Sequence, residues 1–338
     1  MKNHLQNAWR FADVWNASLE ERAEREMKIR DNVWASELGR APIDVWLKMR
    51  ATPFTNPPNA RSLRKFEAGN VFEWIVSLIL KRAGILQESQ KWSSYQYEGL
   101  IEVTGKADFI AGGKPDIEKW KSESRSLGLP DVFLRVGDSI LEYFEKNYPD
   151  GLAIMPLEIK SVSAFMFEAL ERNQQSSKIH RMQLFHYLKS DNHPFGSIVY
   201  ICRDDLRIIE FLVENPSDTE QEYKNTIEIL SAYHQENKQP PLEQPIVFDE
   251  DIGKFAKNFN VAYSPYLKML YGFNDQNAFD NVYQPKVARW NRVMCRIRDG
   301  KNMTKLNEEV KQEITDAGFN IDELIPKFVP NKDEEDNL

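Results

Sequence analysis

Gly151-Leu-Ala-Ile-Met-Pro-Leu-Glu-Ile-Lys160 is the stretch of sequence that decides the predicted fold. It follows the turn-forming residues Pro149 and Asp150, and its apolar run predicts a buried strand. Because successive side chains of a strand point to opposite faces, Glu158 and Lys160 share one face. The Glu-x-Lys pattern is weak by itself, and only one copy follows such an apolar run. The copies begin at Glu26, Glu158, Glu222, Glu236 and Glu309.

A second predicted strand, residues 101–110, carries the motif Gly105-Lys-Ala-Asp108. Its apolar side chains alternate, so that Ala107 and Phe109 lie on one face and Asp108 lies on the other. Asp108 is therefore expected to meet Glu158 across a sheet. An isolated Gly-x-x-Asp is more often a turn or strand-end aspartate, and the Glu158 strand is what favours a shared site.

The motif Gly69-Asn-Val-Phe-Glu73 lies in a predicted helix. A carboxylate at Glu73 is expected to be buried, and a buried carboxylate needs a proton, an ion-pair partner or a bound cation. Gly69 leaves room for another backbone or a ligand. The alternative is a glutamate at the end of the core whose carboxylate reaches solvent. The apolar helix stripe that Glu73 interrupts consists of Phe66, Gly69, Val76, Leu80 and Ala83.

Regular apolar spacing predicts another helix over residues 178–189, which places Gln183 and Tyr187 on one face. An amide and a phenol so placed can hydrogen-bond a phosphate group or a lysine such as Lys160, although such a pair is more often an ordinary helix surface. His180 and His186 in the same helix are interpreted as histidines with hydrogen-bond partners rather than as metal ligands.

In this order the four motifs resemble those of the RecB-like exonuclease family of the PD-(D/E)XK nuclease superfamily, which includes CRISPR-associated and phage exonucleases. The resemblance covers residues 34 to 213. It implies an α/β fold with a PD-(D/E)XK restriction-endonuclease-like core, in which a mixed central sheet is flanked by helices, with helical N- and C-terminal additions. It also implies that the motif residues line one cleft and are catalytic: Glu73, Asp108, Glu158, Lys160, Gln183 and Tyr187.

Phosphodiester hydrolysis requires an activated water and stabilisation of the charge that develops on the phosphate, and hard divalent cations supply both. Mg²⁺ and Mn²⁺ prefer oxygen ligands. We therefore expect Glu73, Asp108, Glu158 and the Ile159 carbonyl to bind one or two such ions. Lys160 is expected to orient the nucleophile or to neutralise charge, so that Lys160→Ala removes activity and leaves metal binding largely intact.

The chain departs from the family pattern in two places. Iron–sulfur members place one cysteine near the start of the core, where this chain has Ala41, and the only two cysteines, Cys202 and Cys295, exclude a four-cysteine cluster within one chain. The gap between Asp108 and Glu158 is longer than the usual hairpin. It predicts an insertion over residues 112–150, with a helix near residues 131–147, that borders the cleft.

Length and composition fit a folded cytoplasmic protein. The 338 residues are 41% hydrophobic and 12% aromatic, and they contain no secretory signal and no apolar run long enough to cross a bilayer. The net charge of −8 argues against a broad nucleic-acid-binding surface. DNA binding, to ends or single strands, is therefore expected to be modest and assisted by metal and by a partner such as a helicase, a recombinase or another protein subunit.

Four regions are expected along the chain: an N-terminal helical extension over 1–33, the nuclease core over 34–215, a helical region over 216–330, and a disordered acidic tail over 331–338. The apolar residues expected to pack inward from the extension are Leu5, Trp9, Phe11, Val14 and Trp15. In the C-terminal region, core packing is the better interpretation, and base stacking the alternative, for Tyr263, Tyr266, Tyr271 and Phe273.

The sequence is thus interpreted as a divalent-metal-dependent deoxyribonuclease that functions in recombination, repair or phage DNA metabolism. The resemblance alone favours an exonuclease. Two alternatives stay open: a structure-specific or restriction-type endonuclease, and a non-catalytic DNA-binding scaffold that has kept the nuclease fold.

Overall fold

The computed structural model describes residues 10–23, 27–116, 118, 137–250 and 252–329. The chain divides into two compact units. The first is formed by Met1–Thr52 and Pro58–Gln239, and the second by Pro53–Pro57 and Pro240–Leu338. The expected acidic tail, and Leu5 and Trp9 of the N-terminal extension, lie outside the described residues.

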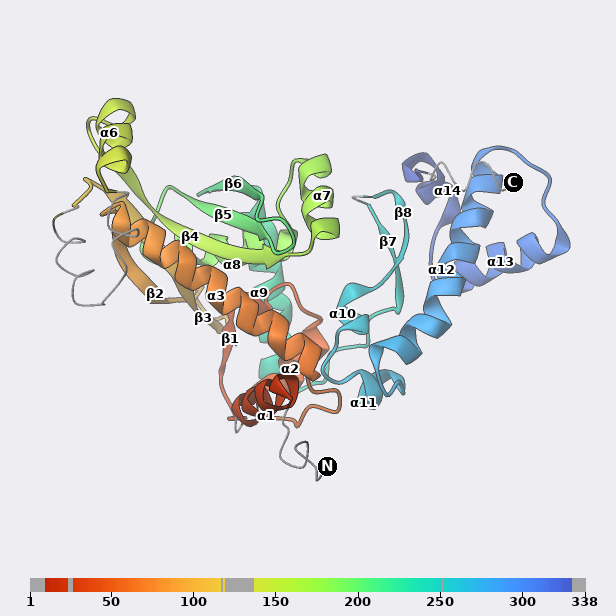
Figure 1. Cartoon of the computed structure of the whole chain (residues 1–338). Helices are drawn as coiled ribbons and strands as arrows, with labels where there is room; N and C mark the ends of the chain where they lie inside the picture. The colour runs from red at the N-terminus through yellow and green to blue at the C-terminus, as the bar shows by residue number, and fades with distance from the viewer. Residues whose placement is uncertain (1–9, 24–26, 117, 119–136, 251, 330–338) are drawn as a thin grey trace, which may run out of the picture. The chain divides into compact units, whose positions relative to one another are not determined.

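The first unit is built on a mixed sheet, which has six strands in the described part of the chain (Figure 1). Its strands are β1 (Asn32–Trp34), β2 (Leu86–Tyr95), β3 (Glu102–Gly113), β4 (Leu152–Val162), β5 (Phe195–Cys202) and β6 (Ile208–Glu214). The order is β1-β3-β4-β5-β6, and β2 also pairs with β3. β1 runs parallel to β3 and β4 runs parallel to β5, whereas the other neighbours are antiparallel.

Helices cover both faces of this sheet. They are α1 (Phe11–Ala23), α2 (Pro42–Met49), α3 (Ala60–Arg82), α6 (Gly137–Asn147), α7 (Ala164–Asn173), α8 (Lys178–Asp191) and α9 (Thr219–Gln235), with the short 3₁₀ turn η1 (Ala35–Glu37). On one face Leu80 of α3 packs in a cluster with Leu157 and Val199. On the other face Leu184 of α8 packs in a cluster with Ile198. These contacts confirm the predicted α/β class with a mixed central sheet flanked by helices.

Helix α1 buries less of its apolar surface than the sequence predicts. Phe11, Val14 and Trp15 are 66%, 55% and 37% exposed, so the expectation that they pack inward is wrong, whereas Leu19 is buried. The main packing partner of α1 is α3, and a single neighbouring helix covers only part of an apolar stripe. Phe66, expected in the buried stripe of α3, is also 60% exposed.

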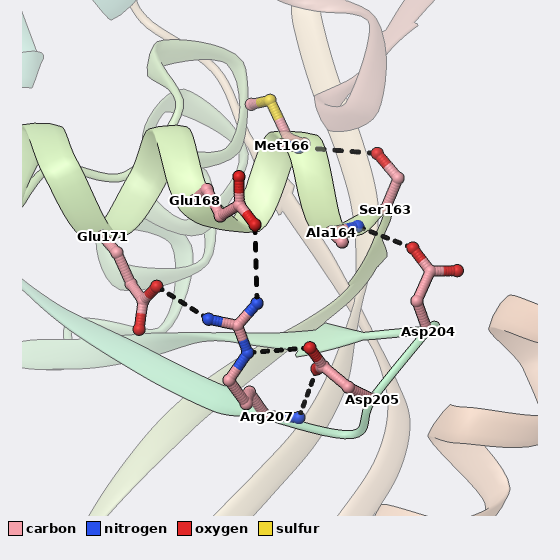
Figure 2. A network of polar contacts seen from close by, with 8 residues as sticks. All are labelled: Ser163, Ala164, Met166, Glu168, Glu171, Asp204, Asp205 and Arg207. Atoms are coloured by element: carbon pink, nitrogen blue, oxygen red, sulfur yellow. Dashed lines mark hydrogen bonds and ion pairs between the residues drawn. The ribbon is translucent and has the colours of Figure 1, made fainter.

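Polar contacts tie α7 to the turn between β5 and β6 (Figure 2). Asp204 accepts a hydrogen bond from the backbone N–H of Ala164 at 2.8 Å, at the first residue of α7. Arg207 donates to Asp205 at 2.9 Å and to Glu171 of α7 at 3.0 Å. The hydroxyl of Ser163 caps the helix. This network fixes the segment that leaves β4 beyond Lys160.

The second unit consists mainly of helices. Its elements are β7 (Ile246–Asp249), β8 (Lys254–Lys257), α10 (Phe259–Ala262), α11 (Leu267–Tyr271), α12 (Gln276–Arg298), α13 (Lys305–Asp316), α14 (Ile321–Leu324) and the 3₁₀ turn η2 (Ile325–Lys327). The β7–β8 hairpin was not predicted in this region. Tyr266 is fully buried and therefore cannot stack on a base, whereas Tyr263 is 51% exposed. No described helix is both long enough and apolar enough to span a bilayer.

Candidate active site

Asp108 and Glu158 lie where strands β3 and β4 separate. Phe109 is the first residue of β3 that pairs with β4, and it lies opposite Leu157. Beyond it, the backbone N–H of Ile159 is bonded to the side chain of Asp108, whose Oδ2 accepts at 2.8 Å. The aspartate thus replaces a backbone partner at the fork, which fixes its carboxylate beside β4.

Glu158 is almost fully buried, at 1% exposed. Its Oε1 accepts a hydrogen bond from the ammonium of Lys160, which lies on the same strand. Its Oε2 is buried and has no hydrogen-bond partner among the described residues. Burial raises the pKa of Glu158 to about 8, Lys160 lowers this pKa, and Asp108 and Glu73 raise it. A buried carboxylate oxygen without a donor is a position that favours a cation or a proton.

Glu73 of α3 and Asp108 belong to the same electrostatic group. The pKa of half-buried Glu73 is raised to about 7, by burial first and then by Asp108, while Lys160 lowers it. Burial also raises the pKa of Asp108, against the lowering effects of Lys160 and the Ile159 N–H. For Lys160 burial alone would lower the pKa, but the three carboxyl groups raise it above its ordinary value. The three acids and one lysine therefore influence one another directly.

The described side chains of histidine, cysteine, aspartate and glutamate include no group of three or more that is arranged to hold a metal ion. The predicted ligands therefore come together electrostatically without forming a ready coordination shell. The Ile159 side chain lies in the core, and its N–H is used by Asp108.

Gln183 and Tyr187 of α8 are buried, at 7% and 1% exposed. The Tyr187 hydroxyl accepts from the Gln183 amide at 3.0 Å, and the Lys106 backbone also hydrogen-bonds it. Burial raises the pKa of Tyr187, and the charge of Glu158 raises it further. The charges of Glu158 and Asp108 thus reach Tyr187, and its burial argues against the expected direct contact with a substrate phosphate.

Gly105, the first residue of the Gly-x-x-Asp motif, lies against the ring of Tyr187, the last residue of the Gln-x-x-x-Tyr motif. A Cβ atom at this position would lie 2.9 Å from Cε1 of Tyr187 and 3.0 Å from Cβ of Ala35. The glycine is therefore required because the tyrosine ring occupies the space. At Gly69 the nearest atom to such a Cβ is Oγ of Ser161 at 3.5 Å, which is an ordinary contact.

This difference between the two glycines gives a first prediction. Gly105→Ala is expected to displace Tyr187 and to lower the free energy of unfolding by about 1–3 kcal/mol through overpacking. Gly69→Ala is the matched control, and it is expected to be neutral or to stabilise α3 by up to about 1 kcal/mol. Urea unfolding measures both changes. Equal effects of the two variants would contradict the contact with Tyr187.

Sequence reasoning missed Gln90 of β2. Its amide Nε2 lies 3.5 Å from Oδ1 of Asp108, the oxygen that Ile159 does not use. Its backbone is left-handed, with φ of 51°. No periodic pattern marks a glutamine in this conformation, because the contact joins residues from two strands.

Both histidines of α8 have hydrogen-bond partners, as expected. Nδ1 of His180 lies 2.8 Å from the Tyr200 hydroxyl. Nε2 of His186 lies 3.1 Å from Oγ of Ser93, and its Nδ1 lies 2.9 Å from the Tyr223 hydroxyl. Burial lowers the pKa of His186 to about 4.

Glu73 and His186 give opposite dependences of stability on pH. The pKa of His186 in the folded state, about 4, lies below its value in the unfolded state. The contribution of neutral His186 to the free energy of unfolding is therefore lost as the pH falls toward 4. The pKa of Glu73 in the folded state, about 7, lies above its value in the unfolded state. The contribution of protonated Glu73 to the free energy of unfolding is therefore lost as the pH rises toward 7. The metal-free protein is therefore expected to be most stable in mildly acidic solution.

Glu73→Gln is expected to stabilise the metal-free protein above neutral pH. The gain is about 1 kcal/mol, allowing for solvent screening at a half-buried group, and it should vanish in acid where Glu73 is protonated. Urea unfolding at about pH 5 and about pH 8.5 measures the difference. The control is Glu210→Gln at an exposed position of β6, which is expected to leave the free energy of unfolding nearly unchanged at both pH values. A gain of equal size at both pH values would show that Glu73 is not the titrating group.

The chain was compared with known families, curated proteins and solved structures. No family model matches it, and no curated protein matches it significantly. It is similar to a solved structure described as the crystal structure of SSO0001, with 16% sequence identity and a TM-score of 0.42. The likeness covers 70% of this chain and 90% of that chain.

Proposed function

We propose that this chain is a divalent-metal-dependent deoxyribonuclease with a PD-(D/E)XK core of the RecB-like type. The observation that carries the proposal is the electrostatic group of Glu73, Asp108, Glu158 and Lys160, drawn from α3, β3 and β4. Such a group favours hydrolysis of a phosphodiester, because that reaction needs an anion-binding cation and an activated water at one place. The order of the four motifs adds the resemblance to exonucleases that act on DNA ends or single strands.

The chemistry of the donor atoms suits a hard divalent cation, which prefers oxygen ligands, although the described side chains do not form a ready coordination shell. Glu158 offers a buried oxygen without a hydrogen-bond donor, and burial holds the pKa values of all three carboxyl groups above their ordinary range. A cation would therefore replace protons that the metal-free site retains. Glu73, Asp108, Glu158 and the Ile159 carbonyl would hold Mg²⁺ or Mn²⁺, one ion or two. Such an ion supplies a water of lowered pKa and a Lewis acid for the phosphoryl oxygen.

The chain's own groups have separate roles in this proposal. Lys160 keeps its proton beside Glu158 and offers a hydrogen-bond donor to the nucleophile or to a phosphate oxygen. Gln183 and Tyr187 are positioning residues in this proposal, because both are buried, are hydrogen-bonded to each other, and place the Tyr187 hydroxyl where the charge of Glu158 influences it. The Asp108 carboxylate is fixed by the Ile159 N–H.

Incubation of end-labelled DNA with the protein tests this function. The substrates are linear and circular DNA, each single- and double-stranded, with Mg²⁺, with Mn²⁺ or with a chelator. An exonuclease shortens linear DNA in the presence of the metals and leaves circles intact. Cleavage of circles would instead favour a structure-specific or restriction-type endonuclease. DNA that is bound but not cleaved with either metal would overturn the proposal in favour of a non-catalytic scaffold.

A further inference from the structure

Gln90 has an unusual backbone for a residue inside a strand. Its neighbours pair regularly with β3, Ser89 with Phe109 and Lys91 with Ala107, so Gln90 falls opposite Asp108. Its φ of 51° nevertheless lies in the left-handed region. Residues other than glycine adopt this backbone region at an energetic cost. Such residues are concentrated at functional sites, where the strained backbone orients a side chain.

The glutamine side chain contacts the aspartate that lies opposite it. Its amide donates to Oδ1 of Asp108 over 3.5 Å, while the Ile159 N–H donates to Oδ2 over 2.8 Å. The two oxygens are therefore held from opposite sides, one by a side chain of β2 and the other by the backbone of β4. Both donors lower the pKa of Asp108, which favours its charged form.

We propose that Gln90 is a positioning residue that orients the Asp108 carboxylate toward the bound cation. The inference rests on the proposed function, since the orientation matters only if Asp108 holds a metal. The left-handed backbone aims the amide at the carboxylate, and the amide limits rotation of Asp108 about its side-chain bonds. An exposed glutamine with this strain has no packing role that would otherwise explain it.

The chain offers a matched control for this proposal. Gln174, at the C-terminal end of α7, is also left-handed, with φ of 50°. Its amide donates to the carbonyl of Glu171 and not to an acidic side chain. Gln174→Gly therefore relieves the same backbone strain as Gln90→Gly without any change near Asp108.

The test measures Mn²⁺ affinity by titration calorimetry, DNA cleavage and Tm for both glycine variants of the full chain. Gln90→Gly is expected to weaken Mn²⁺ binding by about 10-fold and to lower cleavage by at least as much. This is the usual effect of removing a residue that hydrogen-bonds a metal ligand. Both variants are expected to keep or raise Tm, by up to about 3 °C. Gln174→Gly is expected to bind Mn²⁺ and to cleave DNA like the wild type.

Gln90→Asn tests the amide itself. Asparagine tolerates the left-handed region and keeps an amide on a shorter side chain, so partial retention of Mn²⁺ affinity is expected. Wild-type Mn²⁺ affinity and cleavage in Gln90→Gly would overturn the inference while leaving the proposed function intact. A wild-type protein that binds no Mn²⁺ and cleaves no DNA would overturn the proposed function, and the inference with it.

Discussion

Lys160→Ala is expected to lower DNA cleavage by about a thousandfold, the scale of losing a preorganised charge next to a developing anion. Lys160 donates to Glu158, and its charge lowers the pKa values of Glu73 and Asp108 as well. No other cation is among the causes that shift the pKa values of these three described carboxyl groups. The variant therefore removes both the donor and the counter-charge of the site.

The same substitution is expected to change how metal binding depends on pH. From the sequence we expected binding to stay largely intact, but without Lys160 the carboxyl groups would bind protons more tightly than they do now. A metal ion must then displace those protons. Mn²⁺ affinity is therefore expected to fall at about pH 7 and to recover at about pH 9, which calorimetry at the two pH values measures.

Lys189→Ala is the control for this prediction. Lys189 of α8 forms an ion pair with Glu220 at 2.6 Å and does not shift the pKa of the site carboxyl groups. The variant also removes one ion pair between a lysine and a glutamate, and it should leave cleavage and Mn²⁺ affinity unchanged. An active Lys160→Ala protein would remove the lysine from the mechanism. If the Mn²⁺ affinity of Lys160→Ala did not vary with pH, protons would not compete with the metal for the carboxyl groups.

The elements that carry the motifs could be predicted because their signals are local. Alternating apolar side chains marked residues 101–110 and a continuous apolar run marked residues 152–157, and the structure has strands β3 and β4 there. Helical spacing marked residues 178–189, and α8 covers them. β3 pairs with β4, as expected from the predicted meeting of Asp108 and Glu158 across a sheet, and both faces of the two strands are buried there because helices cover the sheet on both sides.

The remaining features depend on contacts between distant residues. The sequence gives no reason for a glycine at position 105 of a predicted strand, whereas in the structure the ring of Tyr187 leaves no room for a Cβ atom there. Phe11 and Trp15 have the spacing of a buried stripe, but burial also needs a neighbour that covers them. No periodic pattern of the sequence could indicate the left-handed backbone of Gln90, because its contact with Asp108 joins two different strands.

Asp108→Asn is expected to lower cleavage by about a thousandfold or more and to weaken Mn²⁺ binding, because the loss of one anionic ligand removes several kcal/mol of interaction with a divalent cation. The asparagine oxygen can still accept from the Ile159 N–H, which Asp108 bonds at 2.8 Å. The fork between β3 and β4 is therefore expected to persist. Tm measured in the absence of metal should fall little or rise, because a buried charge has been removed.

Asp204→Asn is the matched control, since Asp204 also accepts a backbone N–H at 2.8 Å, from Ala164 (Figure 2). Both variants keep a backbone hydrogen bond and lose one negative charge, and they differ in the site to which that charge belongs. Asp204→Asn is expected to cleave DNA and bind Mn²⁺ like the wild type. Equal activity in the two variants would mean that charge at the β3–β4 fork is not needed. A large fall of the metal-free Tm in Asp108→Asn would show that its loss of cleavage and of Mn²⁺ binding comes from a folding defect and not from the missing ligand.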